Sequence, residues 1–197
     1  MTDVRHLRAE DLPDATEVLT RAFSTDEVFT WVFPDEAKRP GQVRIWMEMA
    51  ARLSHQRGHA YVTDPPGGVT AWSPPDVEFF DDATLGLIGT LIGAADPARA
   101  EITLTSLAEV GAHHPEEAHF YLHAIGVDPD AQGQGLGSVL LGQMTAVCDA
   151  QGLPAYLESS SARNRTLYER HGFEVTAELE MPMDGPTVRP MWREPRR

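Results

Sequence analysis

The sequence predicts a single α/β domain with a mixed β-sheet and helices on both of its faces. In the second half of the chain, strand-like and helix-like segments alternate and end in a hairpin, a pattern typical of such a sheet. A chain of 197 residues suits one domain, because this length buries roughly 70% of the unfolded surface without disulfides or metal. No repeat, low-complexity segment or linker divides the chain, so we expect residues 1–197 to fold together.

The composition is that of a globular protein, with 42% hydrophobic and 23% charged residues. Acidic residues number 30 against 16 basic ones, which gives a net charge of −14. A negative field of this size repels phosphate backbones and anionic lipid. We therefore expect neither nucleic acid nor a membrane surface as a partner.

The cysteine content and the N-terminus predict a cytoplasmic protein. Cys148 is the single cysteine, so no internal disulfide can form and a reducing compartment is indicated. Residues 1–5 lack the basic-then-apolar pattern of a secretory signal. The longest apolar stretch, residues 85–95, is well short of the ~20 residues that a membrane-spanning helix needs.

In the first half, helical spacing is interrupted by turn residues. Residues 4–8 alternate apolar and polar side chains, which predicts a strand. Asp11 is a suitable N-cap and Pro13 suits a first turn, so a helix should follow. Pro40-Gly41 is expected to break the chain. The further expected elements are helices at 25–33, 43–57 and 82–110, the last restarting at Pro97, and a hairpin formed by 59–63 and 69–72.

The second half is more regular. Pro190 is a departure, because a proline inside the last strand removes a hydrogen-bond donor and indicates a strand break. The expected strands lie at 119–127, 154–158, 173–181 and 187–193, and the expected helices at 137–151 and 160–170.

Gln132-Gly133-Gln134-Gly135-Leu136-Gly137 lies directly between an expected strand and an expected helix. Glycines let backbone N–H groups approach an anion closely, and a helix N-terminus adds unpaired donors with partial positive charge. This combination predicts a phosphate site, although a tight turn with nothing bound also fits. The spacing suits neither a Walker loop nor a dinucleotide fingerprint.

Two motifs resemble those of the GNAT family of N-acetyltransferases. Residues 122–129 and 132–137 are similar to its acetyl-CoA motif, whose core is Arg/Gln-x-x-Gly-x-Gly/Ala. Asn164, Tyr168 and Gly172-Phe173 are similar to its second signature. The resemblance covers residues 118–193, and within the family the runs 126–138 and 162–173 are most similar to the puromycin-type branch.

The resemblance implies a sheet splayed at the acetyl-CoA strand, with residues 116–193 binding acetyl-CoA and residues 1–115 forming the acceptor side. Gly126 would ease a bulge in that strand, and no metal is expected, because the histidines and Cys148 show no ligand spacing. The residues implied to bind acetyl-CoA are Ile125, Gly126, Val127, Gln132, Gly133, Gln134, Gly135, Leu136, Gly137, Ser138 and Asn164.

The resemblance also implies catalytic residues. Tyr168 matches the family tyrosine that hydrogen-bonds or protonates the leaving thiolate. Strand periodicity places His119, Tyr121 and His123 on one face, and Phe120, Leu122 and Ala124 on the other. For the base that takes the amine proton, His123 is the first choice, His119 the second and Glu158 the third, and bulk water is a further alternative.

The expected function is transfer of acetyl from acetyl-CoA to a primary amine, chiefly of a small molecule. Two alternatives stay open: a protein or peptide amine as acceptor, and a non-catalytic CoA-binding sensor, for which Tyr168 would have no use. An open groove beside His119 would favour a peptide, whereas a closed aromatic pocket would favour a small molecule. The sequence also leaves a homodimer open.

Overall fold

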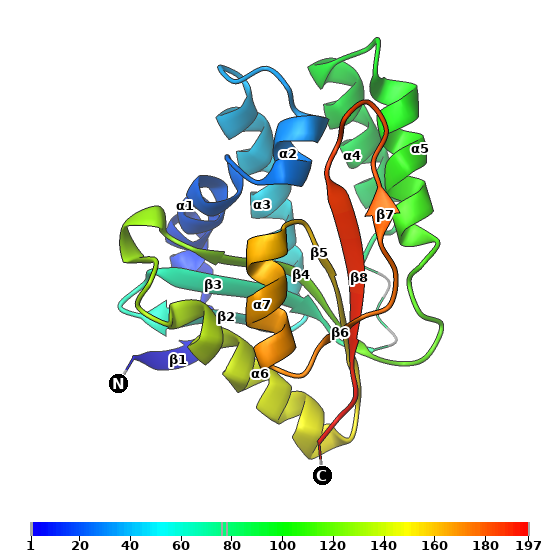
Figure 1. Ribbon diagram of the computed structural model, residues 1–197. Coiled ribbons are helices and arrows are strands. Elements are labelled where there is room, and N and C mark those ends of the chain that lie inside the picture. Colours follow the sequence, from blue (N-terminus) through cyan, green and yellow to red (C-terminus); the bar gives the residue numbers. More distant parts are fainter. Residues whose placement is uncertain (1, 76, 78, 197) are drawn as a thin grey trace.

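The computed structural model describes residues 2–75, 77 and 79–196, and its centre is an open β-sheet with helices on both faces (Figure 1). The strands are β1 (Asp3–His6), β2 (Ala60–Asp64), β3 (Gly68–Ser73), β4 (Phe120–Val127), β5 (Ala155–Ser159), β6 (Glu174–Val175), β7 (Leu179–Glu180) and β8 (Thr187–Arg193). Their order across the sheet is β1-β2-β3-β4-β5-β8-β6, and β7 also pairs with β8. β4 and β5 are parallel and the other pairs are antiparallel, which confirms the predicted mixed sheet.

The helices divide between the two faces of the sheet. Figure 1 shows α6 and α7 in front of the sheet and α3 behind it, with α4 and α5 beside the turn that joins β7 to β8. The α-helices are α1 (Leu12–Phe23), α2 (Glu27–Val32), α3 (Arg39–Gln56), α4 (Asp82–Ala95), α5 (Ala100–Gly111), α6 (Leu136–Gln151) and α7 (Ala162–Arg170), and short 3-10 turns lie at Ala9–Asp11 and Pro129–Ala131.

Two hydrophobic clusters fill the space between the helices and the sheet. One joins α1 and α3 to the sheet through residues such as Leu19, Met47 and Val69. The other joins α6 to the opposite face through residues such as Leu140, Met144 and Leu157. Apolar residues at helical spacing in α1 and α6 therefore hold the sheet from both sides, as the periodicity predicted.

Three details of the first half differ from the sequence-based expectation. Pro40-Gly41 does not break the chain, because α3 already begins at Arg39 and proline is tolerated in a first turn. α5 begins at Ala100 instead of Pro97, since residues 97–99 form a turn after Asp96, whose carboxylate accepts from the Ala98 amide. Asp11 precedes α1 without capping it, and its carboxylate is bound by Arg5 at 2.6 Å instead.

The expected strand at 173–181 is interrupted, and Pro190 explains where. The Pro190 carbonyl accepts a hydrogen bond from the Thr176 amide at 2.9 Å, so the backbone of Pro190 faces β6 and β7. Pairing with β6 ends at Val175 and pairing with β7 begins at Leu179. The missing donor of Pro190 thus falls in the interval between the two short strands, and the break lies in the partner of β8.

Candidate active site

β4 and β5 separate from each other halfway along β4. β5 continues to Ser159 and β4 to Val127, but no further pairing joins them in the described part of the chain. β4 remains paired with β3 from Tyr121 to Val127, with one irregularity. We call the opening between residues 123–127 of β4 and residues 158–160 the split. The paired positions are Phe120 with Ala155, Tyr121 with Tyr156 and Leu122 with Leu157.

A β-bulge at His123 marks the start of the split. Ala71 of β3 lies opposite Ala124, whereas the next residue, Trp72, lies opposite Leu122, so His123 is the extra residue. An extra residue reverses the alternation of side chains. Leu122 therefore packs in the cluster with α6, whereas Ala124 packs in the cluster with α1 and α3. The expectation that Ala124 shares a face with Leu122 is wrong for this reason.

The bulge also determines which backbone groups face the split. The Asp128 amide donates to the Gly67 carbonyl next to β3, at 2.8 Å. Because backbone direction alternates along an antiparallel strand, Gly126 points toward β3, and Ile125 and Val127 point toward the split. The Val127 carbonyl accepts from Gln132 Nε2 at 3.3 Å, which agrees with this direction.

Gly126 serves close packing and not the bulge, which corrects the sequence-based expectation. A Cβ atom at Gly126 would lie 2.9 Å from Leu19 Cδ2 and 3.0 Å from Ala22 Cβ. These contacts are too short for any side chain, so glycine lets α1 lie directly on β4. α1 thereby covers the face of the sheet beside the split.

The glycine loop has the backbone conformation that an anion site requires. Gly133 and Gly135 have φ angles of +78° and +81°, in the left-handed region that favours glycine. Gly135 is the N-cap of α6, and residues 132–135 are exposed. Within the described residues, the N–H groups of 133–137 donate no hydrogen bond. They are free to bind an anion, so the loop fits a phosphate group of a ligand.

The start of α6 is fixed by its neighbours. Ser138 Oγ lies 2.7 Å from His171 Nε2 at the end of α7, and Gly137 lets Leu167 of α7 approach. Arg21 of α1 binds Asp128 at 2.6 Å and Asp130 at 2.9 Å, in the turn before the loop. The loop is therefore held between α1 and α7. The Leu136 side chain is buried, so only its backbone is available to a ligand.

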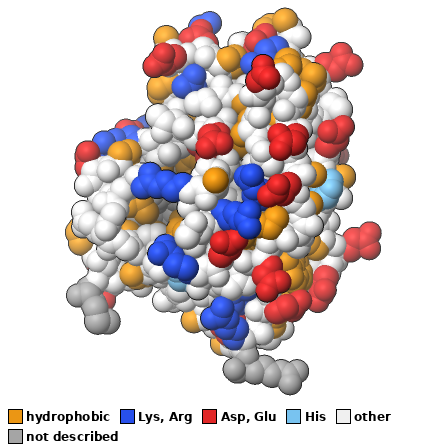
Figure 2. Space-filling view, viewed as in Figure 1, with side chains coloured by type: hydrophobic (Ala, Val, Ile, Leu, Met, Phe, Trp, Pro, Cys, Tyr) orange, Lys and Arg blue, Asp and Glu red, His pale blue; other side chains and the backbone are white. Residues whose placement is uncertain are grey.

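Charge is distributed unevenly around this region. Figure 2 shows Lys and Arg side chains gathered near the middle of the face where α7 lies, while Asp and Glu side chains are spread more widely. α7 itself carries Arg163, Arg165 and Arg170. In a chain with a net charge of −14, this face is the more favourable one for an anionic ligand.

Tyr168 and Asn164 both lie on α7. Tyr168 is 6% exposed, and burial, followed by the charge of Asp26, raises the pKa of its phenol. The Tyr168 hydroxyl makes no hydrogen bond to another described residue. Asn164 lies in the first turn of the helix, where its backbone amide donates to Ser161 Oγ at 3.3 Å.

Glu158 lies at the start of the split and is held by Tyr121. The Tyr121 hydroxyl donates to Glu158 Oε2 at 2.6 Å. Burial raises the pKa of the Glu158 carboxyl to about 7, although the hydrogen bond from Tyr121 lowers it. Glu158 can therefore exchange a proton near neutral pH.

His123 is enclosed by aromatic residues. Its ring stacks on Phe79 with 3.3 Å between the ring centroids, and its Nε2 lies 3.0 Å from Ser73 Oγ. Burial lowers the pKa of His123 well below its usual value. The imidazole is therefore neutral at physiological pH, and its Nδ1 is buried without a hydrogen-bond partner among the described residues.

His119 lies at the opposite end of β4 from the glycine loop. Its ring is 7% exposed and contacts the rings of His114, Tyr156 and Trp192. Its Nδ1 lies 2.5 Å from the Glu117 carbonyl. His119 is thus separated from the split by the paired part of β4 and β5.

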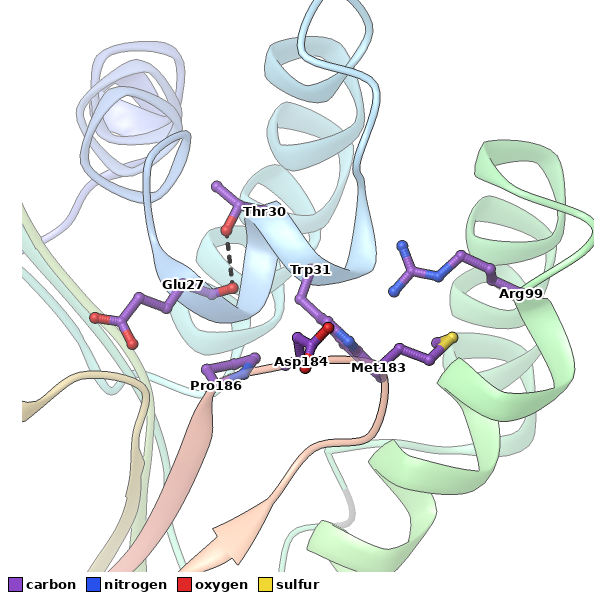
Figure 3. Close-up of a pocket in the computed structure, with 8 residues that line it drawn as sticks. Glu27, Thr30, Trp31, Arg99, Met183, Asp184 and Pro186 are labelled. Atoms are coloured by element: carbon purple, nitrogen blue, oxygen red, sulfur yellow. Dashed lines mark hydrogen bonds between the residues drawn. The ribbon is translucent and has the colours of Figure 1, made fainter.

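Two further features were not predicted from the sequence. Asp26, before α2, accepts a hydrogen bond from Ser160, which follows β5, at 2.5 Å. A cavity of about 510 Å³ lies between α2, Arg99 and the turn joining β7 to β8 (Figure 3). Trp31 lines this cavity, whereas Phe33 is fully buried and Phe79 covers His123.

Residues 92–175 match the family model described as an acetyltransferase (GNAT) domain. An uncharacterized N-acetyltransferase of Schizosaccharomyces pombe is 37% identical over 73 residues, which is 37% of this chain and 30% of that protein. The chain therefore spans about a third of the length of this curated relative.

Solved structures match over nearly the whole chain. The structure titled histone acetyltransferase HPA2 and related acetyltransferase, from Corynebacterium glutamicum, is 25% identical, covers 100% of this chain and 97% of its own, and has a TM-score of 0.75. Arylalkylamine N-acetyltransferase 2 of Aedes aegypti has a TM-score of 0.72 at 14% identity, with 98% of each chain covered. The second likeness concerns the fold alone.

The fold is similar to that of a solved acetyltransferase over the whole chain, and residues 92–175 match an acetyltransferase domain model. Residues 92–175 are thus similar to a GNAT acetyltransferase domain, and enzymes of this fold use acetyl-CoA. Among the residues that the structure describes, no group of three or more His, Cys, Asp or Glu could hold a metal ion. No described helix has the length and apolar character needed to cross a membrane.

Proposed function

We propose that the protein transfers acetyl from acetyl-CoA to the primary amine of a small molecule, with both substrates bound and the amine attacking directly. The observation that carries this proposal is the split in the sheet beside a glycine loop with free N–H groups. When bound, acetyl-CoA supplies an acetyl group activated as a thioester. The loop residues 132–138 and Asn164 would hold the cofactor, and Ile125 and Val127 would offer backbone groups from the edge of β4.

Tyr168 is proposed to stabilise the leaving thiolate. Its pKa is raised above that of an ordinary phenol, so the hydroxyl keeps its proton at neutral pH. A thiolate, with a pKa near ~8.5 for an ordinary thiol, is a weaker base than this phenolate. Tyr168 is therefore best suited to donate a hydrogen bond to the thiolate, and complete transfer of its proton would be uphill.

Among the three proposed bases, Glu158 has the best support. Its pKa of about 7 leaves part of the population ionised at neutral pH, and it lies where the split begins. His123 is neutral but enclosed by Phe79 and Ser73, and His119 lies far along the paired strands. We therefore propose that Glu158 takes the amine proton, with Tyr121 positioning its carboxylate.

The cavity supports a small acceptor. It holds about 510 Å³, which is within the usual size range of small-molecule sites. His119 is buried under aromatic rings, so it offers little surface to a peptide acceptor. The cavity takes residues from both ends of the chain, so we extend the proposed acceptor side beyond residues 1–115 to the turn at 183–186.

A thiol-release assay tests the proposal. Purified protein is incubated with acetyl-CoA and a panel of puromycin, polyamines, arylalkylamines and short peptides. We expect amine-dependent release of CoA, which Tyr168→Phe lowers at least about tenfold in kcat. Glu158→Gln should lower kcat by about 100-fold and remove the rise of kcat with pH near pH 7.

Each outcome has a separate meaning. Release with peptides alone would favour the protein-amine alternative, and tight acetyl-CoA binding without release on any acceptor would favour the sensor. Release unaffected by Tyr168→Phe would refute the role of that residue alone. The puromycin-type likeness, the homodimer and the cytoplasmic location stay predictions, which the panel, mass measurement in solution and cell fractionation test.

A further inference from the structure

Asp26 is a partly buried carboxylate with no cationic partner among the described residues. Its Oδ1 accepts from the backbone amides of Val28 and Phe29, at 3.0 and 3.3 Å, and so caps α2. Its Oδ2 accepts from Ser160 Oγ at 2.5 Å. Burial raises the pKa of this carboxyl, whereas the three hydrogen bonds lower it. A buried negative charge without a counter-ion is costly, so a cation at this place would be stabilising.

The position of Asp26 is defined by the two sides of the split. Parallel pairing ends at Leu122 with Leu157, and Ser160 lies three residues beyond Leu157, on the β5 side of the split. Asp26 follows α1, which lies against Gly126, and reaches over to Ser160. The carboxylate therefore lies above the opening where acetyl transfer is proposed.

Tyr168 provides a second indication of this position. The charge of Asp26 contributes to the raised pKa of the Tyr168 phenol, so the two groups are close in space. The titratable groups that act on Asp26 from the elements packed around it are Glu27 on α2 and Tyr168 on α7. Neither is a cation, so neither compensates the carboxylate charge.

We propose that Asp26, held in place by Ser160, binds the ammonium group of an alkylamine acceptor. This rests on the proposed acetyl transfer. An alkylamine has a pKa near that of lysine, ~10.4, and so arrives protonated at neutral pH. Asp26 would hold this ammonium beside the split until Glu158 takes its proton. The preferred acceptors would then be alkylamines that are charged at neutral pH, in preference to arylamines or alcohols.

The cavity of Figure 3 can receive the rest of such an acceptor. It is lined by Glu27, which follows Asp26 directly in the chain. The Arg99 guanidinium lies over the Trp31 ring at 5.5 Å, and the Trp31 indole donates to the Pro182 carbonyl at 2.9 Å. Trp31 therefore forms a fixed aromatic wall against which an apolar or aromatic tail can pack.

The turn on the opposite wall has a strained backbone. Met183 and Asp184 have φ angles of +56° and +54°, which non-glycine residues rarely adopt. A Cβ at Gly185 would lie 2.7 Å from Trp31 Nε1, so the turn is pressed against the aromatic wall. Backbone strain of this kind is often found at active sites and ligand-binding sites. The open cavity is thus bounded by Trp31 on one side and by this turn on the other.

Asp26→Asn is the variant that tests the ammonium site. An asparagine side chain keeps the carbonyl that caps α2 but lacks the charge. Asp81→Asn is the matched control, because Asp81 caps α4 in the same way, accepting from the Thr84 amide at 2.8 Å. Thermal unfolding of both variants shows whether each is folded.

Binding is measured without turnover, by calorimetry with saturating CoA. The probes are 2-phenylethylamine and butylamine, each compared with the alcohol of the same shape. We expect wild type and Asp81→Asn to bind each amine at least tenfold more tightly than its alcohol. In Asp26→Asn this preference should vanish, while the affinity for CoA changes less than twofold. In turnover assays the same variant should raise the KM for the amine more than it lowers kcat.

Equal binding of amine and alcohol by the wild type, no amine binding at all, or an unchanged preference in Asp26→Asn would overturn the ammonium site. A different result would refute the proposed activity, namely binding of these amines as expected without release of CoA on any acceptor. Conversely, acetyl transfer that continues with unchanged KM in Asp26→Asn would refute the ammonium site and leave the proposed activity intact.

Discussion

Replacing the buried Glu158 by glutamine should stabilise the protein above neutral pH and change it little in acid. Burial raises the Glu158 pKa from 4.5 to about 7, so the folded state disfavours the ionised carboxyl. One pKa unit corresponds to about 1.4 kcal/mol. The ionised side chain therefore lowers the stability of the folded protein by about 3 kcal/mol at pH 8, relative to its protonated form.

The sign follows from proton binding. Between pH 4.5 and about 7 the folded state keeps the Glu158 proton and the unfolded state loses it. The contribution of this group to stability is complete below pH 4.5 and is lost as the pH rises through 7. Glu158→Gln stays neutral throughout, and its amide carbonyl can still accept the hydrogen bond from Tyr121.

Urea unfolding at a series of pH values measures the effect. The difference in unfolding free energy between Glu158→Gln and wild type should grow from near zero at pH 4.5 to about 3 kcal/mol at pH 8. Glu169→Gln is the control, since Glu169 forms an exposed pair with Arg165 on α7 that is worth at most ~1 kcal/mol. A difference that stays constant with pH, or that is largest in acid, would refute the burial argument whatever the enzyme activity proves to be.

Three further substitutions test how the site is held. Gly126→Ala should destabilise the protein by about 1–3 kcal/mol in urea unfolding, because its Cβ would lie 2.9 Å from a side chain of α1, whereas Gly41→Ala, with open space around it, should not. Gly135→Ala should weaken acetyl-CoA binding about tenfold in calorimetry, because φ is +81° there; equal affinity would show that the loop conformation is unimportant. Arg21→Ala removes the ion pair that holds the turn at Asp128, so it should lower the affinity for acetyl-CoA a few-fold. The Tm should hardly change, since exposed ion pairs contribute about 0–1 kcal/mol. An unchanged affinity would contradict the idea that Arg21 holds the loop in place.

Local chemistry made much of residues 116–193 predictable. The glycines between 133 and 137 and the helix that follows them are specified by neighbours in the chain, and the structure has both where the sequence places them. The hairpin of β2 and β3 is likewise specified by its own turn residues. Such features depend on backbone preferences within a few residues.

The bulge could not be predicted from the residues that form it. His123 has no intrinsic preference for a bulge, and its position depends on how β4 aligns with β3, some 50 residues earlier in the chain. Glycine at 126 suggested a bulge there, but its cause is the approach of α1. Both misassignments come from contacts between distant segments.

The pairing of Asp26 with Ser160 is a still more distant contact, with a separation of 134 positions along the chain. The sequence contains one usable signal, since Asp26 is a good N-cap just before a helical stretch. That signal predicts the hydrogen bonds of Oδ1 to the start of α2, but it does not predict the partner of Oδ2. Only the folded arrangement brings the second oxygen to the end of β5.

The bulge at His123 determines which face of the sheet each of residues 124–127 occupies, because it sets the number of residues in β4. Substituting His123 leaves the count of residues intact, so Ala124 and Gly126 still face α1. Deleting it would shift the count by one and exchange the two faces for every residue from Ala124 to Val127. Ile125 would then be directed at α1, and the amides of Ile125 and Val127 would turn toward β3. The length of this strand is therefore under a stricter constraint than the identity of its extra residue.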